Sequence, residues 1–173
     1  MLPLIAFAAP SGTGKTTLLK QLIPLLQQRN IRPGLIKHTH HHMDIDTPGK
    51  DSYQLRKAGA DQVLVASQQR WALMTETPDN DVNPDLFYLA SRLDASSLDV
   101  ILIEGFKNEC VPKIILWREA TGGNLCELLD KEVIAVASDR PLTVGVPCLD
   151  LNQPQLIADF VIDWLKSEEN TES

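Results

Sequence analysis

The beginning of the chain places a glycine-rich loop between two apolar segments. Residues 2–8 (LPLIAFA) are apolar along their whole length, which is typical of a fully buried strand. Residues 9–15 (APSGTGK) follow at once, and over residues 16–30 leucine and isoleucine recur with helical spacing. The sequence therefore predicts a strand, a loop and a helix in succession. Pro24 lies inside the predicted helix and predicts a kink or a break, because proline has no backbone donor.

The residues GTGKT in this loop are typical of a phosphate-binding loop between a strand and a helix. Glycines at 12 and 14 allow backbone angles that a side chain would hinder, so the N–H groups of residues 12–16 can point at phosphate oxygens. The start of the helix adds the positive end of its dipole. In such a loop Lys15 reaches the β- and γ-phosphates of a nucleotide and the Thr16 hydroxyl binds Mg²⁺. The usual pattern has glycine where this chain has Ala9.

A phosphate-binding loop also needs an acid for its metal ion. The run VILIEG ends a predicted buried strand with Glu104, which is where that acid belongs. Asp99 is five residues upstream, about 16 Å away along an extended strand and therefore at the wrong end of the sheet. We therefore expect Thr16 and Glu104 to form the metal site and Lys15 and Glu104 to be the catalytic residues. The alternative is that Glu104 only caps the turn after the strand.

All four histidines of the chain lie in the run HTHHH, residues 38–42. Three interpretations of this run stay open. The run is a solvated polar loop, an independent metal site, or a segment that closes over phosphate and Mg²⁺ together with Asp44 and Asp46. The histidines concerned are His38, His40, His41 and His42.

A later strand, AVAS, ends at Asp139, whose carboxylate could accept hydrogen bonds from N1–H and the 2-amino group of guanine. The usual Asn-Lys-x-Asp guanine motif is absent from the chain, and an aspartate that merely caps the next turn fits the sequence equally well. The full set of candidate nucleotide-binding residues is Ser11, Gly12, Thr13, Gly14, Lys15, Thr16, Thr17, Asp44, Asp46 and Asp139.

Apolar strands and amphipathic helices alternate along the chain, which predicts a mostly parallel sheet covered by helices on both faces. We expect strands near residues 32–38, 98–105, 113–117 and 132–138, and helices over residues 51–60 and 153–166. Another helix is expected to begin after Asn83 as its N-cap, with Pro84 in its first turn. The runs QVLVAS and RWALMTE predict a β-hairpin over residues 62–76. Residues 1–167 are expected to form a single domain that carries this hairpin as an extension, and residues 168–173 a frayed tail.

Composition excludes several classes of protein. The net charge of −7 argues against a nucleic-acid or membrane-surface binder, which would need a basic face. The chain has three cysteines and no C-x-x-C pair, which fits a reducing cytoplasm and not a disulfide framework. No run approaches the roughly 20 apolar residues of a membrane span.

Several stretches together resemble a known family, the molybdopterin-guanine dinucleotide biosynthesis protein B (MobB) family. They are SGTGKTTLL, GLIKHTHHHMDIDTPGKDSYQLRKAGA, ASQQRWALMTE and ILIEGFK, and the resemblance covers residues 4–160. It implies a three-layer P-loop fold, GTP binding with Mg²⁺, and weak GTPase activity. It also implies an accessory role beside the enzyme that attaches GMP to molybdopterin, with molybdopterin as a further candidate ligand. The family is dimeric, with β-strands of the two subunits meeting at the interface.

Two other classes of function stay open. The run PSGTGKT is also similar to the loop of guanylate kinases, but such kinases clamp phosphates with clustered arginines, and the seven arginines of this chain are scattered. A non-catalytic module that binds the nucleotide only as a regulatory ligand is the second alternative. No motif places a catalytic glutamine or arginine, and Gln68, Gln69 and Arg70 are candidates only if a second chain presents them.

Overall fold

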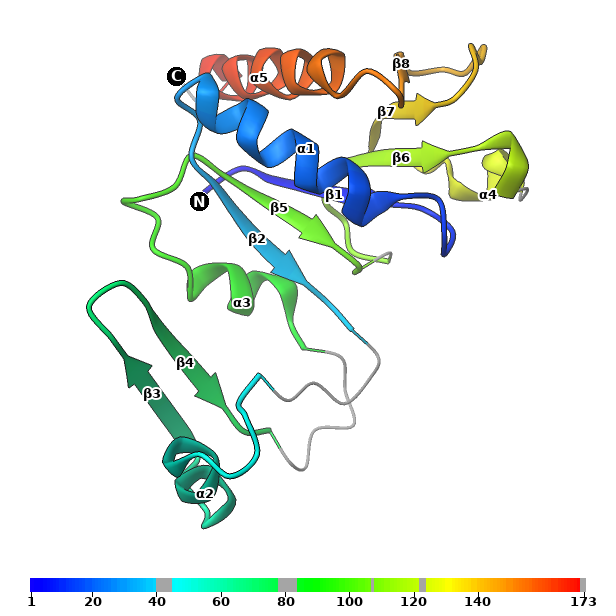
Figure 1. Ribbon diagram of the computed structural model, residues 1–173. Helices are drawn as coiled ribbons and strands as arrows, with labels where there is room; N and C mark the ends of the chain where they lie inside the picture. The colour runs from blue at the N-terminus through cyan, green and yellow to red at the C-terminus, as the bar shows by residue number, and fades with distance from the viewer. Residues whose placement is uncertain (40–44, 78–83, 107, 122–123, 172–173) are drawn as a thin grey trace. The chain divides into compact units, whose positions relative to one another are not determined.

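The structure is a computed structural model that describes residues 1–39, 45–77, 84–106, 108–121 and 124–171 (Figure 1). The contacts divide the chain into two compact units. The sheet unit comprises Met1–His38 and Asp85–Ser173, and the hairpin unit comprises Thr39–Pro84. Each unit is described by itself. No helix within the described ranges is long and apolar enough to cross a membrane.

The sheet unit is built on six strands in the order β2-β5-β1-β6-β7-β8, and every neighbouring pair is parallel. This arrangement confirms the predicted mostly parallel sheet. All five residues of the central strand β1 are buried, because both faces of the sheet are covered. The strands are β1 (Leu4–Ala8), β2 (Pro33–Lys37), β5 (Val100–Glu104), β6 (Lys113–Trp117), β7 (Val133–Ser138) and β8 (Cys148–Asp150).

Helices cover both faces of this sheet. Helices α1 (Lys15–Gln28) and α5 (Pro154–Thr171) lie side by side on one face (Figure 1), where buried apolar residues of both helices form one cluster with Ile5 and Phe7 of β1. Leu4 and Ala6, the alternate residues of β1, point to the opposite face and pack in one cluster with residues of α3 (Leu86–Ser91). The short helix α4 (Leu125–Leu128) packs against a further cluster around Ile115 and Trp117.

Four details of the sheet unit differ from the sequence-based expectations. Helix α1 continues through Pro24, so of the predicted kink or break the break is wrong, and the fully buried Leu22 and Leu26 on either side hold the helix against the sheet. Helix α3 begins only at Leu86, and Asp85 caps it by accepting a hydrogen bond from the Tyr88 N–H at 2.8 Å. Helix α5 continues past Ser167 and ends at Thr171. The short elements β8 and α4 were not predicted. The expected N-cap at residue 83 lies outside the described residues.

The hairpin unit contains α2 (Asp51–Lys57) followed by β3 (Gln62–Ala66) and β4 (Trp71–Thr75), which pair antiparallel as predicted. The turn is closed by the Ser67 N–H, which donates to the Arg70 carbonyl at 2.7 Å. Arg56 of α2 is buried and pairs with Glu76, directly after β4, at 2.6 Å. This ion pair ties the helix to the end of the hairpin.

One ion pair in the sheet unit has a buried cation. The side chain of Lys113, the first residue of β6, is 5% exposed, and its Nζ lies 2.7 Å from Asp130 Oδ2. The hydrogen bond from Lys113 holds the pKa of Asp130 below its ordinary value of 3.8. Because the folded-state pKa is lowered, the pair stabilises the fold above that ordinary value, and this stability is lost as the pH falls below it.

We expect Asp130→Asn to lower the free energy of unfolding by about 1–3 kcal/mol at pH 7, because it leaves a buried ammonium without its counter-charge. Urea denaturation measures the loss, which should shrink as the pH falls below 3.8, because the carboxylate of the wild-type protein then loses its charge and the two proteins become alike. Asp163→Asn is the matched control, since its pair with Lys166 is exposed on both sides and should contribute less than about 0.5 kcal/mol. Equal losses in the two variants would contradict this account of Lys113.

Candidate nucleotide-binding site

The glycine-rich loop joins the end of β1 to the start of α1. Gly12 and Gly14 have φ angles of 79° and 102°, in the left-handed region that favours glycine. Thr13 between them is fully buried, and both its N–H and its hydroxyl donate to the Pro10 carbonyl, at 3.4 and 2.9 Å. Ala9 is buried and does not have a positive φ, so the loop forms with alanine in place of the usual glycine.

The helix that follows the loop begins at Lys15, with Gly14 as its N-cap and no side chain capping it. The first backbone N–H groups of α1 are therefore available to an anion. The Lys15 ammonium folds back over the loop and donates to the carbonyls of Ala9 and Pro10, at 3.1 and 3.4 Å. Ser11 and Thr17 are exposed on either side of it.

Thr16 and Glu104 meet as expected, although 88 residues separate them in the sequence. The Thr16 hydroxyl donates to Glu104 Oε1 at 3.1 Å, and the Glu104 side chain is only 12% exposed. Parallel pairing of β1 with β5, in which Phe7 is opposite Glu104, brings the carboxylate to the loop. A hydroxyl and a carboxylate are oxygen ligands that Mg²⁺ prefers, so this pair fits a magnesium site.

Lys37 is a residue of this site that the sequence analysis missed. It ends β2 directly opposite Glu104 of β5, and its Nζ lies 3.5 Å from Glu104 Oε2. Asp99, in contrast, lies at the other end of β5, where its carboxylate accepts hydrogen bonds from the Arg32 backbone and guanidinium. The structure thus separates the two acids as the sequence predicts.

The turn after Glu104 is packed against His38. Gly105 has a φ of 106°, and a Cβ there would lie 2.8 Å from the Cβ of His38. The His38 N–H donates to the Glu104 carbonyl at 2.8 Å, and its ring centroid is 4.8 Å from that of Phe106. His38 is therefore placed beside the strand that carries the acid, and glycine at 105 makes this approach possible.

Of the remaining candidates of the histidine run, only Asp46 lies within the described residues. His40, His41, His42 and Asp44 lie outside the described residues. Asp46 belongs to the hairpin unit, where it accepts hydrogen bonds from the Thr47 N–H and the Ser52 hydroxyl. Among the residues that the structure describes, no three histidine, cysteine or acidic side chains are grouped to hold a metal ion.

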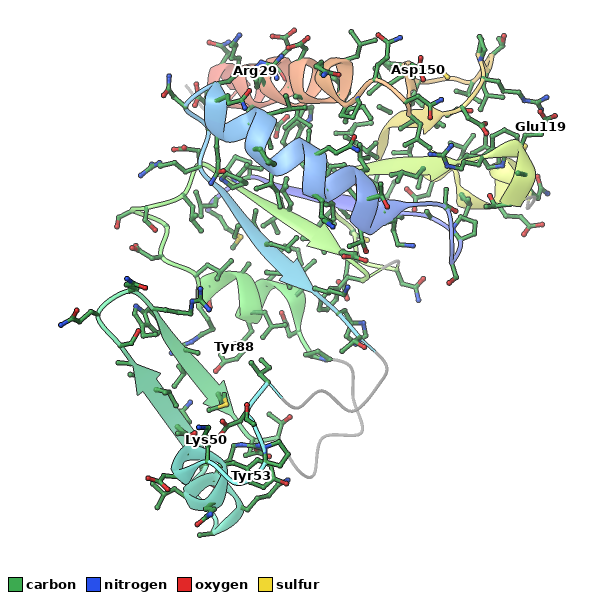
Figure 2. All side chains as sticks on the ribbon, viewed as in Figure 1. Arg29, Lys50, Tyr53, Tyr88, Glu119 and Asp150 are labelled. Atoms are coloured by element: carbon green, nitrogen blue, oxygen red, sulfur yellow. The ribbon has the colours of Figure 1, made fainter. Side chains whose placement is uncertain are left out.

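Asp139, directly after β7, lines a cavity of about 410 Å³ at the ends of β7 and β8. This volume is in the range of small-molecule sites, and its lining includes Leu142, Cys148 and Asp150. Asp139 Oδ1 accepts a hydrogen bond from the Glu119 N–H at 3.2 Å. Figure 2 labels Glu119, which lies on the turn after β6.

A second missed residue, Arg118, precedes Glu119 on the same turn. Its Nε donates to the Thr13 carbonyl of the glycine-rich loop at 2.9 Å, across 105 positions of sequence. No local pattern around LWREA indicates this contact, because it depends on β6 lying next to β1 in the sheet. The short turn after β6 therefore contacts both the loop and Asp139.

Comparison with known proteins gives these features a family context. Residues 4–139 match the family model described as Molybdopterin guanine dinucleotide synthesis protein B, MobB. A protein of Escherichia coli (strain K12), named molybdopterin-guanine dinucleotide biosynthesis adapter protein, is 63% identical over 169 residues, covering 97% of this chain and 96% of that protein. A Haemophilus influenzae protein of the same name is 47% identical over 164 residues, covering 95% of this chain and 90% of that protein.

Solved structures agree with this context. The crystal structure of Bacillus subtilis MobB is similar with a TM-score of 0.73 and 26% identity, covering 94% of this chain and 97% of the other. A crystal structure of molybdopterin-guanine biosynthesis protein B has a TM-score of 0.76 at 23% identity, covering 94% and 99%, and shows the shared fold alone. The family model and the two relatives carry the assignment further: this chain belongs to the molybdopterin-guanine dinucleotide synthesis protein B (MobB) family.

Proposed function

We propose that this protein binds GTP with Mg²⁺, hydrolyses it slowly, and acts as an adapter in molybdopterin-guanine dinucleotide biosynthesis. The adapter role follows the names of the relatives from Escherichia coli and Haemophilus influenzae. The observation that carries nucleotide binding is the pairing of the glycine-rich loop with an acid at 3.1 Å from Thr16. The family match is to MobB, which favours this function over the kinase alternative.

In this proposal the phosphates lie on the loop between β1 and α1. The N–H groups of residues 12–16 and the Lys15 ammonium bind phosphate oxygens, while Thr16 and Glu104 hold Mg²⁺. The metal ion neutralises charge that develops on the phosphates. Lys37, whose Nζ lies 3.5 Å from Glu104 Oε2, adds a further cation beside the proposed metal site.

The cavity beside Asp139 is our proposed site for the base. A carboxylate matches the donors N1–H and 2-amino of guanine, whereas adenine has no 2-amino group and an unprotonated N1. One oxygen of Asp139 is held by the Glu119 N–H, which fixes the direction of the carboxylate. Loss of a charge-assisted hydrogen bond costs about 1.5–3 kcal/mol, so we expect GTP to bind at least tenfold more tightly than ATP.

We further propose that the protein acts in the cytoplasm beside the enzyme that attaches GMP to molybdopterin, with molybdopterin as a second candidate ligand. The net charge of −7 gives no basis for a nucleic-acid or membrane partner. A protein that holds a guanine nucleotide and contacts this enzyme has the chemistry an adapter of that reaction needs.

The hairpin is our proposed dimer interface. Leu64 and Leu73 are opposite each other in the register and, with Trp71, share one face of the two strands. Their side chains are 59%, 40% and 65% exposed in the single chain. A two-stranded hairpin is marginal by itself, and an apolar face of this kind is stabilised by pairing with a second copy.

Glu104→Gln tests the metal site. The variant keeps size and hydrogen bonding but loses the charge, so Mg²⁺-dependent phosphate release should fall at least tenfold, with a smaller loss of GTP affinity. Glu168→Gln on the exposed end of α5 is the control and should leave both unchanged. Unaltered hydrolysis in Glu104→Gln would show that Glu104 only orders the turn.

Asp139→Asn tests the base site. Xanthine carries a carbonyl where guanine has the 2-amino group, and an asparagine amide can donate to it. The variant should therefore lose at least tenfold in GTP affinity and gain affinity for XTP, as measured by competition binding. Asp150→Asn, in the same cavity, is the matched control. If the preference changed from GTP to XTP in Asp150→Asn instead, or in neither variant, Asp139 would not be the residue that recognises the base.

The hairpin variant Leu64→Arg/Leu73→Arg tests the dimer. Light scattering of the wild-type protein at micromolar concentration should give about twice the chain mass of 19.2 kDa, and the variant should give one chain. Leu156→Arg, at an exposed leucine of α5, is the control and should stay dimeric. A wild-type monomer would contradict this proposal.

A further inference from the structure

The contact of Arg118 with the glycine-rich loop has a consequence for the loop's backbone. Arg118 Nε donates to the Thr13 carbonyl at 2.9 Å, and its Nη2 lies 4.0 Å from the place that a Cβ of Gly14 would occupy. The guanidinium therefore lies against the Thr13–Gly14 peptide. In a trans peptide the carbonyl and the following N–H point in opposite directions, so the direction of the Thr13 carbonyl fixes that of the Gly14 N–H.

This peptide is of a kind that turns over easily. Gly14 on one side has a φ of 102°, and glycine accepts angles of either sign at little cost. The other polar groups of Thr13, its N–H and its hydroxyl, both donate to the Pro10 carbonyl and so fix the residue from the opposite side. The orientation of the Thr13–Gly14 peptide therefore depends on what holds the carbonyl, and Arg118 supplies that contact.

Arg118 is itself presented from a fixed turn. Its carbonyl accepts hydrogen bonds from the Thr121 N–H and hydroxyl, at 3.2 and 2.9 Å. The neighbouring Glu119, labelled in Figure 2, donates its N–H to Asp139 and pairs its carboxylate with Arg140, which lies over the Trp117 ring. The turn is thus anchored to the ends of β6 and β7.

We propose that Arg118 is a positioning residue of the phosphate site: by holding the Thr13 carbonyl, it keeps the Gly14 N–H turned toward the bound phosphates. The proposal rests on the function proposed above, in which this loop binds phosphate. It assigns to Arg118 an effect on the loop that is present before the nucleotide binds. The planar guanidinium, unlike an ammonium, donates along a fixed direction, so lysine should not replace it fully.

The test uses Arg118→Gln and Arg118→Lys, with Arg92→Gln as the control, because Arg92 is exposed and contacts the Tyr88 ring on α3. The first measurement is amide hydrogen exchange of ligand-free protein, with the Thr13 N–H as the reporter. We expect exchange at Thr13 to become at least about fivefold faster in Arg118→Gln and to stay unchanged in Arg92→Gln. Circular dichroism checks that each variant is folded, and Arg118→Lys serves if Arg118→Gln is not.

The second measurement is GTP affinity with Mg²⁺ in the same proteins. We expect Arg118→Gln to lose about tenfold, with Arg118→Lys recovering only part of that loss. Unchanged exchange at Thr13, unchanged GTP affinity, or full recovery by lysine would each overturn the proposal. If the wild-type protein binds no GTP while Arg118→Gln still speeds exchange at Thr13, the proposed function fails but the hold of Arg118 on the loop stands.

Discussion

Parallel pairing of β1 with β5 on one side and β6 on the other is the constraint on which the rest of the site depends. Parallel strands end at the same edge of a sheet, so the loop after β1 meets Glu104 from β5 and Arg118 from the turn after β6. The next pairings, β2 with β5 and β7 with β6, add Lys37 and Asp139 to the same edge. The chain is acidic overall, and these strand ends provide the local cations and backbone donors that an anion needs.

Much of the fold could be predicted from the sequence, because the strands are apolar along their whole length and the helices have a regular apolar face. The parts that could not be predicted are those in which packing outweighs local preference. Pro24 is accommodated because buried leucines on both sides hold α1 on the sheet. Strand β8 is only three residues long and carries too short a pattern to recognise, since it is defined by its pairing with β7.

The residues of the candidate site also separate into those that the sequence could predict and those that it could not. The loop from Ser11 to Thr17 has a local pattern, and Glu104 could be identified because a buried strand ends in an acid. Lys37 and Arg118 have no such signal, because their roles arise from the strand order and not from neighbouring residues. The chain has Ala9 where the usual loop pattern has glycine. The structure explains why alanine is accepted there, because Ala9 does not have the positive φ that would require glycine.

The central claim is that the loop between β1 and α1 binds the phosphates of GTP. Calorimetric titration of GTP with Mg²⁺ into the wild-type protein and into Lys15→Ala tests it most directly, with Lys20→Ala on the exposed side of α1 as the control. Lys15→Ala removes an ammonium from the loop without touching the core, so we predict a loss of more than about tenfold, or ~1.4 kcal/mol, in that variant alone. Equal GTP affinity in the wild-type and Lys15→Ala proteins would contradict the account.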